Sequence, residues 1–290
     1  MSFERALAQG DPLAAADALR KTGTRGWVRK AAFDEAAAVI ARVGVASLVR
    51  RDWSLRLLAH PRRVDKELAA VLLRPLAGSH QADVERATQR MAKDDDWEVR
   101  ETGASLLGYA LDAHFERYLP SARSWVTTGE PRLRRAVVIA AKHAARARLA
   151  ERETAILDLV EGAVHQRDEY VRKSLGPFAV GDQLLRSYPE ATLERLARWA
   201  RDPDENARWN AAMAFTMATG ARLGERFFVI LAGIAADERP FVRRAATAAL
   251  RNIVRRRPEL RGAVLEWSGG TRPVIERALR PIRATPAASA

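Results

Sequence analysis

The chain has 290 residues, enough for one large domain or for a repeat array with a continuous core. It contains no cysteine, which excludes disulfides, thiolate zinc sites and cysteine nucleophiles. Lys and Arg number 49 against 36 Asp and Glu, and the net charge of +13 favours polyanionic partners unless it only reflects an arginine-rich genome.

The positions of the histidines and of the apolar residues argue against further kinds of site and segment. The five histidines form no HxxxH or HExxH pattern, so we expect neither a metal site nor a cofactor. No apolar run approaches the roughly 20 residues that a membrane span requires. The segment from Met1 to Arg5 includes an acidic residue and lacks the apolar stretch of a signal peptide. We therefore expect a cytoplasmic protein with no membrane partner.

One block of residues recurs along the chain, and each copy begins a predicted helix. The block is an acidic or proline turn, an apolar residue, an arginine and a polar or basic residue. The earliest copy covers residues 27–30, and a degenerate copy follows near residues 65–68. The clear copies place their arginines 34 to 38 residues apart, at Arg100, Arg134, Arg172, Arg208 and Arg243.

Local sequence explains why helices begin at these blocks. Asp or Glu lies in the first turn, where the helix dipole favours negative charge. Pro131 and Pro240 occupy early positions that need no amide donor. Apolar residues follow at helical spacing, and Ala-rich faces permit close packing. The same spacing predicts a further helix between blocks, at residues 84–91, 115–125, 153–164, 191–199 and 226–236.

Two helices in every 36 or so residues is the period of an α-solenoid, because one pair cannot bury its apolar face alone. We therefore predict an all-α fold, an α-solenoid (α-α superhelix) of about six HEAT-like helix pairs. No low-complexity linker divides the chain, so we expect one domain over residues 1–283. We expect the Pro/Ala-rich residues 284–290 to fray.

The residue after each aligned arginine forms a second series. The arginine itself is best explained structurally, by pairing with an acidic residue of the preceding turn. The next position forms a basic stripe with one carboxylate and one aromatic residue: Lys30, Glu101, Arg135, Lys173, Trp209 and Arg244. Equivalent positions of successive repeats line one concave surface, so the stripe predicts a groove for a phosphate backbone. The alternative is an exposed face laced with salt bridges, on which Trp209 packs rather than stacks on DNA.

Three segments occur in a distinctive order. They are WEVRETGASLLG at residues 97–108, Trp125 followed by RAVV at 135–138, and DEYVRKSLGP at 168–177 followed by YPE at 188–190. Over roughly residues 25–215 they resemble the AlkD-like family of HEAT-like repeat DNA alkylation repair proteins, in the DNA glycosylase superfamily.

Two positions depart from the pattern of that family. Glu101 stands where the family has a catalytic Asp, four residues after Trp97. Pro177 stands where a second active-site Trp is expected. Pro177 should also interrupt its helix, because it lacks an amide donor and clashes one turn back.

The resemblance implies an enzyme that grips duplex DNA, including alkylated DNA, in the basic groove and excises N3- or N7-alkylated bases. Glu101 would stabilise the oxocarbenium character of the sugar, Trp97 would form an aromatic wall, and Arg135 would hold a phosphate. The remaining stripe residues would complete the DNA contact. The structural alternatives are that Glu101 is a first-turn carboxylate paired with Arg100 or Arg135, and that Trp97 is a packing residue.

Two other functions stay open. The departures at Glu101 and Pro177 also fit a non-catalytic binder of damaged or branched DNA. HEAT arrays most commonly serve as protein–protein scaffolds, which is the third hypothesis. We expect a monomer, and we expect Trp53, Trp125 and Trp199 to lie in the core because they stand among apolar residues.

Overall fold

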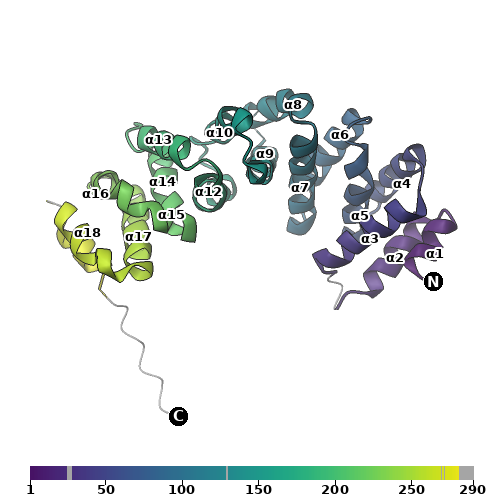
Figure 1. The fold of residues 1–290 in the computed structure, drawn as a ribbon, viewed down its shortest axis with the longest axis horizontal. Helices are drawn as coiled ribbons and strands as arrows, with labels where there is room; N and C mark the ends of the chain where they lie inside the picture. Colours follow the sequence, from purple (N-terminus) through teal and green to yellow (C-terminus); the bar gives the residue numbers. More distant parts are fainter. Residues whose placement is uncertain (25–27, 129, 269, 271, 281–290) are drawn as a thin grey trace, which may run out of the picture. The chain divides into compact units, whose positions relative to one another are not determined.

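A computed structural model describes residues 1–24, 28–128, 130–268, 270 and 272–280. Most of these residues are helical and none forms a β-sheet, which confirms the predicted all-α solenoid-like fold (Figure 1). They group into two compact units, Met1–Ala147 and Arg148–Ala290, and each is described by itself. One domain over residues 1–283 stays a prediction. Trp27 and the tail 284–290 lie outside the described residues.

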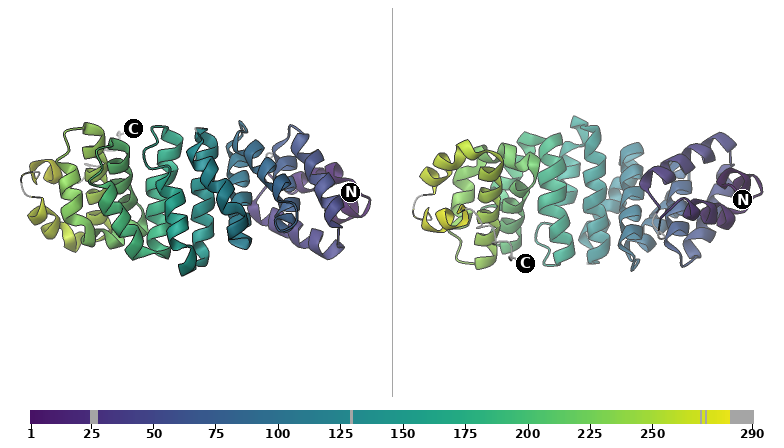
Figure 2. Two further views of the ribbon diagram at one scale, coloured as in Figure 1. Left: turned by 90° about the horizontal axis from the view of Figure 1, so that it is seen from above. Right: turned by 90° about the horizontal axis from the view of Figure 1, so that it is seen from below.

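The first unit consists of stacked helix pairs. Its helices are α1 (Phe3–Ala8), α2 (Pro12–Lys21), α3 (Lys30–Val43), α4 (Ser47–Ala59), α5 (Arg63–Leu73), α6 (Gln81–Ala92), α7 (Trp97–Ala113), α8 (Phe115–Thr127) and α9 (Pro131–Ala144). Helices α4 and α5, α6 and α7, and α8 and α9 pack as pairs. The second helices also pack on one another in the order α3, α5, α7 and α9, which makes one continuous layer (Figures 1 and 2).

The second unit repeats this arrangement. Its helices are α10 (Glu153–Glu161), α11 (Glu169–Lys173), the π-helix η4 (Ser174–Leu184), α12 (Leu185–Ser187), α13 (Pro189–Trp199), α14 (Glu205–Met213), α15 (Ala218–Leu223), α16 (Phe228–Ala235), α17 (Pro240–Arg256), α18 (Arg261–Trp267) and α19 (Arg272–Ala278). Here η4, α14 and α17 pack in succession. Short 3₁₀ segments complete the chain at residues 74–76, 145–147, 150–152, 214–216, 224–227 and 258–260.

The helix starts follow from the recurring block. Asp96, Asp168 and Asp204 are N-cap residues whose carboxylates accept backbone N–H groups of the first turn of α7, α11 and α14. Pro131 and Pro240 open α9 and α17. All five clear blocks therefore begin helices, as predicted. The helix expected at 226–236 begins later, at Phe228, because residues 224–227 form a 3₁₀ turn.

Pro177 changes the kind of helix that follows α11. The α-helix ends at Lys173, and residues Ser174–Leu184 continue as a π-helix that contains Pro177. A proline has no N–H to donate and its ring collides with the carbonyl one turn back, so the α-helical hydrogen-bond pattern cannot continue through it. The predicted interruption of the α-helix is confirmed, although the chain stays helical.

Arginines of the recurring block form hydrogen bonds with the turn that precedes the second helix of a helix pair. In three repeats an Asp carboxylate accepts the N–H two residues later, and the arginine six residues after that Asp donates to its backbone carbonyl. The pairs are Arg100 with Asp94 (2.8 Å), Arg208 with Asp202 (2.7 Å) and Arg243 with Asp237 (3.0 Å). We call these turn aspartates and ladder cations. The arginine thus binds the backbone of its own preceding turn.

The ladder cations also join successive repeats. Lys66 donates to the Asp94 carboxylate at 2.5 Å, and Arg208 donates to the Asp237 carboxylate at 2.7 Å, each one repeat further along. Lys66 therefore acts as the ladder cation of the copy that appeared degenerate in the sequence. Arg172 donates instead to the side-chain oxygen of Asn206 (3.1 Å). These contacts join neighbouring helix pairs, and Asp237 is also paired within its own turn, by Arg239 at 2.7 Å.

Close packing around α7 depends on two glycines. A Cβ atom on Gly103 would lie 2.6 Å from the Cβ of Met91 in α6. A Cβ atom on Gly108 would lie 2.7 Å from the Cβ of His143 in α9. Any side chain at either position would force α7 away from its neighbours. Trp53, Trp125 and Trp199 are buried, as predicted.

Removing the charge of a turn aspartate should weaken the second unit. Asp237 is 7% exposed, and the Arg239 guanidinium holds the pKa of its carboxyl well below the usual range. Its stabilisation is therefore present above the unfolded pKa of about 3.8 and is lost as pH falls through the folded pKa. We expect Asp237→Asn to lower the free energy of unfolding by about 2–3 kcal/mol at pH 7 and by less at pH 3.

Urea unfolding at the two pH values measures this difference. Glu238→Gln, at the exposed neighbouring position, is the control and should change stability by less than about 0.5 kcal/mol. A loss in Asp237→Asn of equal size at both pH values would show that the ionised carboxylate is not what stabilises the turn.

Candidate functional site

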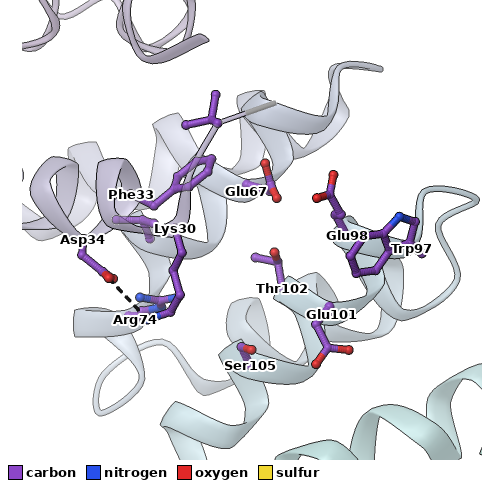
Figure 3. Close-up of a pocket in the computed structure, with 12 residues that line it drawn as sticks. Lys30, Phe33, Asp34, Glu67, Arg74, Trp97, Glu98, Glu101, Thr102 and Ser105 are labelled. Carbon is purple, nitrogen blue, oxygen red and sulfur yellow. Dashed lines mark hydrogen bonds and ion pairs between the residues drawn. The ribbon is translucent and has the colours of Figure 1, made fainter. Parts of the chain in front are cut away.

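The first unit contains a cavity of about 230 Å³ between α3, α5 and α7 (Figure 3). Its lining residues are Val28, Lys30, Phe33, Asp34, Glu67, Val71, Arg74, Trp97, Glu98, Glu101, Thr102 and Ser105. Three residues of the predicted site, Lys30, Trp97 and Glu101, therefore lie around one cavity. Apolar side chains form part of the lining, and the charged side chains of the lining include both carboxylates and cations.

The repeat explains how these side chains reach the cavity. Lys30 opens α3, and Glu101 follows the ladder cation Arg100 in α7. Glu67 follows the ladder cation Lys66 in α5 and stands 34 residues before Glu101. The position after the ladder cation thus lines the cavity from α5 and α7, and Lys30 lines it from the first position of α3. Trp97 lies one helical turn before Glu101, on the same face of α7.

Glu67 is a site residue that the sequence reasoning missed. The stripe has two carboxylates in the first unit, Glu67 and Glu101, rather than one. The copy near residues 65–68 appeared degenerate because its ladder position holds Lys66 in place of arginine. Counting one period of 34 residues back from Glu101 would have found Glu67.

Glu101 is held by an arginine of the next repeat. Its carboxylate accepts a hydrogen bond from Arg135 at 2.7 Å, and the side chains are 39% and 13% exposed, respectively. In Figure 3 the Glu101 carboxylate points away from Glu67 and Glu98. The pairing with Arg135 that we weighed as the structural role of Glu101 is therefore present. It also fixes the position of a carboxylate at the edge of the cavity.

Trp97 is an exposed side chain, 60% accessible to solvent. It is the first residue of α7 and lines the cavity beside Glu98 (Figure 3). Its alternative interpretation as a packing residue between repeats is wrong, because a packed tryptophan would be buried like Trp125. An exposed indole ring beside carboxylates offers a π face to a ligand.

Glu67 is the most deeply buried carboxylate of the cavity, at 9% exposure. Burial raises the pKa of its carboxyl to about 7; the nearby Arg63 guanidinium opposes this shift and Asp96 adds to it. Arg63 Nε lies 3.4 Å from Glu67 Oε2, and Oε2 has no hydrogen-bond partner. The carboxyl therefore changes its charge near neutral pH, inside a cavity and without a strong partner.

Cations gather at the other end of the cavity. Lys30 pairs with Asp34 at 3.3 Å, and both side chains are largely exposed. Arg74 is half-buried, and burial lowers the pKa of its guanidinium. Figure 3 shows Lys30, Asp34 and Arg74 close together and apart from Glu67 and Glu98. The cavity thus has one end that is mainly cationic and one that is mainly anionic.

The other predicted DNA contacts lie in the second unit. Lys173 is exposed and pairs with Glu169 at 2.7 Å. Trp209 stacks on Phe241, with ring centroids 5.6 Å apart and planes 5° from parallel, and the Arg172 guanidinium lies over both rings. Arg244 is exposed on α17. The Trp209 contacts favour its packing interpretation, whereas Lys173 and Arg244 are open to solvent.

Two features are absent from the described residues. No group of three or more His, Asp or Glu side chains among them could hold a metal ion. In the same part of the chain, no helix combines the length and apolar character needed to cross a membrane.

Comparisons with known proteins give no name for this arrangement. No family model matches the chain, and no curated protein matches it either. Among solved structures, the chain is similar to a crystal structure described only as that of an engineered protein. The match covers 95% of this chain and 83% of that chain at 18% sequence identity, with a TM-score of 0.37. A likeness at this level assigns neither a fold family nor a function.

The raised pKa of Glu67 has a consequence for stability. Because the folded pKa of about 7 exceeds the ordinary value of 4.5 for a glutamate, the folded state holds this proton more tightly, and stability falls as pH rises between these values. We expect Glu67→Gln to be more stable than the wild type by about 1–3 kcal/mol at pH 8. The gain should vanish by pH 4.5. Thermal or urea unfolding measured against pH tests this, and a variant that is less stable at pH 8 would contradict it.

Proposed function

We propose that the protein binds duplex DNA and admits a positively charged, alkylated base to the cavity of the first unit. The observation that carries the proposal is the exposed Trp97 at a cavity that also presents Glu67, Glu98 and Glu101. An N3- or N7-alkylated purine is a flat cation. An indole face attracts a cation through its quadrupole, and the carboxylates add Coulombic attraction.

The charge distribution supports DNA as the partner. The first unit has 25 Lys and Arg against 18 Asp and Glu, and the second has 24 against 18, so both carry a net positive charge. The stripe residues Lys30, Lys173 and Arg244 are exposed. Exposed cations attract the phosphate backbone and release its counterions, whatever the base sequence.

The proposed chemistry is hydrolysis of the N-glycosidic bond. The C1′–N bond breaks with its electron pair leaving on the alkylated base, which departs neutral, and positive charge develops on the sugar. The Glu101 carboxylate, positioned by Arg135, stabilises that charge and accepts a proton from the water that bonds to C1′. The alkyl group has already activated the base, so no general acid is required. This activity would be that of an AlkD-type DNA glycosylase.

A second candidate is a non-catalytic binder of damaged or branched DNA. The orientation of the Glu101 carboxylate favours it, because that group points away from Glu67 and Glu98 and is bound to Arg135. Such a protein would use the same cations and the same cavity without excision. A protein scaffold, the third hypothesis, would need neither.

Salt dependence separates the DNA-binding candidates from a scaffold. We expect the Kd for duplex DNA to increase at least about tenfold between 50 and 200 mM salt, because several phosphate contacts release counterions. Lys30→Glu and Arg244→Glu should each weaken binding further and reduce the salt slope. Arg123→Glu, an equal charge reversal on α8 in the other helix layer, is the control and should have a smaller effect. A Kd that does not change with salt, or that does not change with these charge reversals, would contradict DNA binding and favour the scaffold hypothesis.

Excision separates the glycosylase from the non-catalytic binder. With a duplex that contains N7-methylguanine or N3-methyladenine, we expect release of the free base, measured by chromatography. Glu101→Gln should lower the rate about a hundredfold or more, because it removes the charge that stabilises the transition state. Equal rates would remove Glu101 from the chemistry. No release from any duplex that the protein binds would favour the second candidate.

A further inference from the structure

At the anionic end of the cavity, carboxylates gather around the guanidinium of Arg63. Arg63 forms an ion pair with Glu98 of α7 and also lies 3.4 Å from Glu67, so one guanidinium serves two carboxylates. Asp96, at the N-cap of α7, adds a third negative group whose field acts on Glu67. Burying an ionised carboxylate is costly unless a cation compensates it. Among the described residues, Glu67 therefore faces a weakly placed guanidinium, 3.4 Å away and with no hydrogen bond to its Oε2.

The shape of the cavity indicates what kind of cation could bind beside Glu67. Val28, Phe33 and Val71 give it apolar walls, and Trp97 offers an exposed ring. A hydrated metal ion would have to shed its water against these apolar walls. A flat organic cation keeps its charge beside Glu67 while its faces contact apolar and aromatic side chains.

We propose that Glu67 is the ligand-facing acid of this cavity, and that the cavity binds a flat organic cation when this carboxyl is ionised. The inference rests on the proposed function only for the natural ligand, which would be the alkylated base. Its physical basis is independent of DNA: a carboxylate nine-tenths buried, with an oxygen that has no hydrogen-bond partner, lining a cavity with an exposed indole.

The proposal predicts how the affinity of the cavity for a cation changes with pH. Among the described residues, the charged groups around Glu67 are Arg63 on α5, Asp96 at the N-cap of α7, Glu98 and Glu101 on α7, Lys30 and Asp34 on α3, and Arg74 after α5. Among these, Glu67 has a pKa raised to about 7. Its ionised fraction then rises from about one tenth at pH 6 to about nine tenths at pH 8. The affinity for a permanent cation should therefore rise about tenfold over this range.

A pair of small probes tests the proposal on the whole protein without DNA. 1-Methylnicotinamide is a permanent flat cation, and nicotinamide is its neutral counterpart. By calorimetric or NMR titration we expect tighter binding of 1-methylnicotinamide, with the tenfold increase between pH 6 and pH 8. Glu67→Gln should abolish the preference and the pH dependence, whereas the control Asp34→Asn, which removes a carboxylate from the opposite end, should keep the pH dependence. Equal binding of both probes, or a pH dependence that survives in Glu67→Gln, overturns the proposal.

A measurement on the wild type covers the case in which Glu67→Gln fails to fold. In protein labelled with ¹³C at glutamate side chains, one carboxyl should titrate near pH 7. Its midpoint should move to lower pH with 1-methylnicotinamide and stay in place with nicotinamide. Absence of a glutamate that titrates above about pH 6 would overturn the proposal. If the protein binds DNA but not 1-methylnicotinamide, this inference alone is contradicted. If it binds 1-methylnicotinamide but not DNA, only the proposed function is contradicted.

Discussion

The rest of the structure depends on the contact between a ladder cation and a turn aspartate. A turn between two helices contains backbone N–H and C=O groups and an Asp carboxylate. These polar groups need hydrogen-bond partners where neighbouring helices bury them. Asp94 and Asp237 meet this requirement with the N–H two residues later and with a cation from the repeat before. The contact of the arginine with the carbonyl of the turn aspartate recurs before α7, α14 and α17. In the first unit, the residues after Lys66 and Arg100, Glu67 and Glu101, both line the cavity.

The cavity of the first unit lies where α3, α5 and α7 pack in succession. Glu67 and Glu101 reach it because each follows a ladder cation, and Lys30 reaches it from the first position of α3. Glu67 is a buried carboxylate with Arg63 at 3.4 Å and no hydrogen bond to its Oε2, so its ionisation costs stability at neutral pH. Such a cost is characteristic of residues kept for a ligand rather than for the fold.

Much of the fold could be predicted from the sequence because its signals are local. N-cap aspartates, early prolines and the apolar spacing mark helix starts, and Trp53, Trp125 and Trp199 were assigned to the core from their neighbours. The candidate site was predicted only in part. Glu67 was missed because Lys66 replaces arginine in the ladder, and the exposure of Trp97 depends on packing that no local pattern reports. The pairings of Lys30 with Asp34 and of Arg135 with Glu101 likewise depend on side-chain placement in three dimensions.

The central proposal is that the first unit meets DNA at the cavity that Lys30, Glu67, Trp97 and Glu101 line. Photocrosslinking tests it most directly, with a duplex that carries a single 5-iodouracil, which reacts preferentially with aromatic side chains. Peptide mapping should place the crosslink on Trp97, and the Trp97→Ala variant should lose that product while the buried Trp125 stays unmodified. Crosslinks confined to elements outside the cavity, with Trp97 unmodified, would contradict the account.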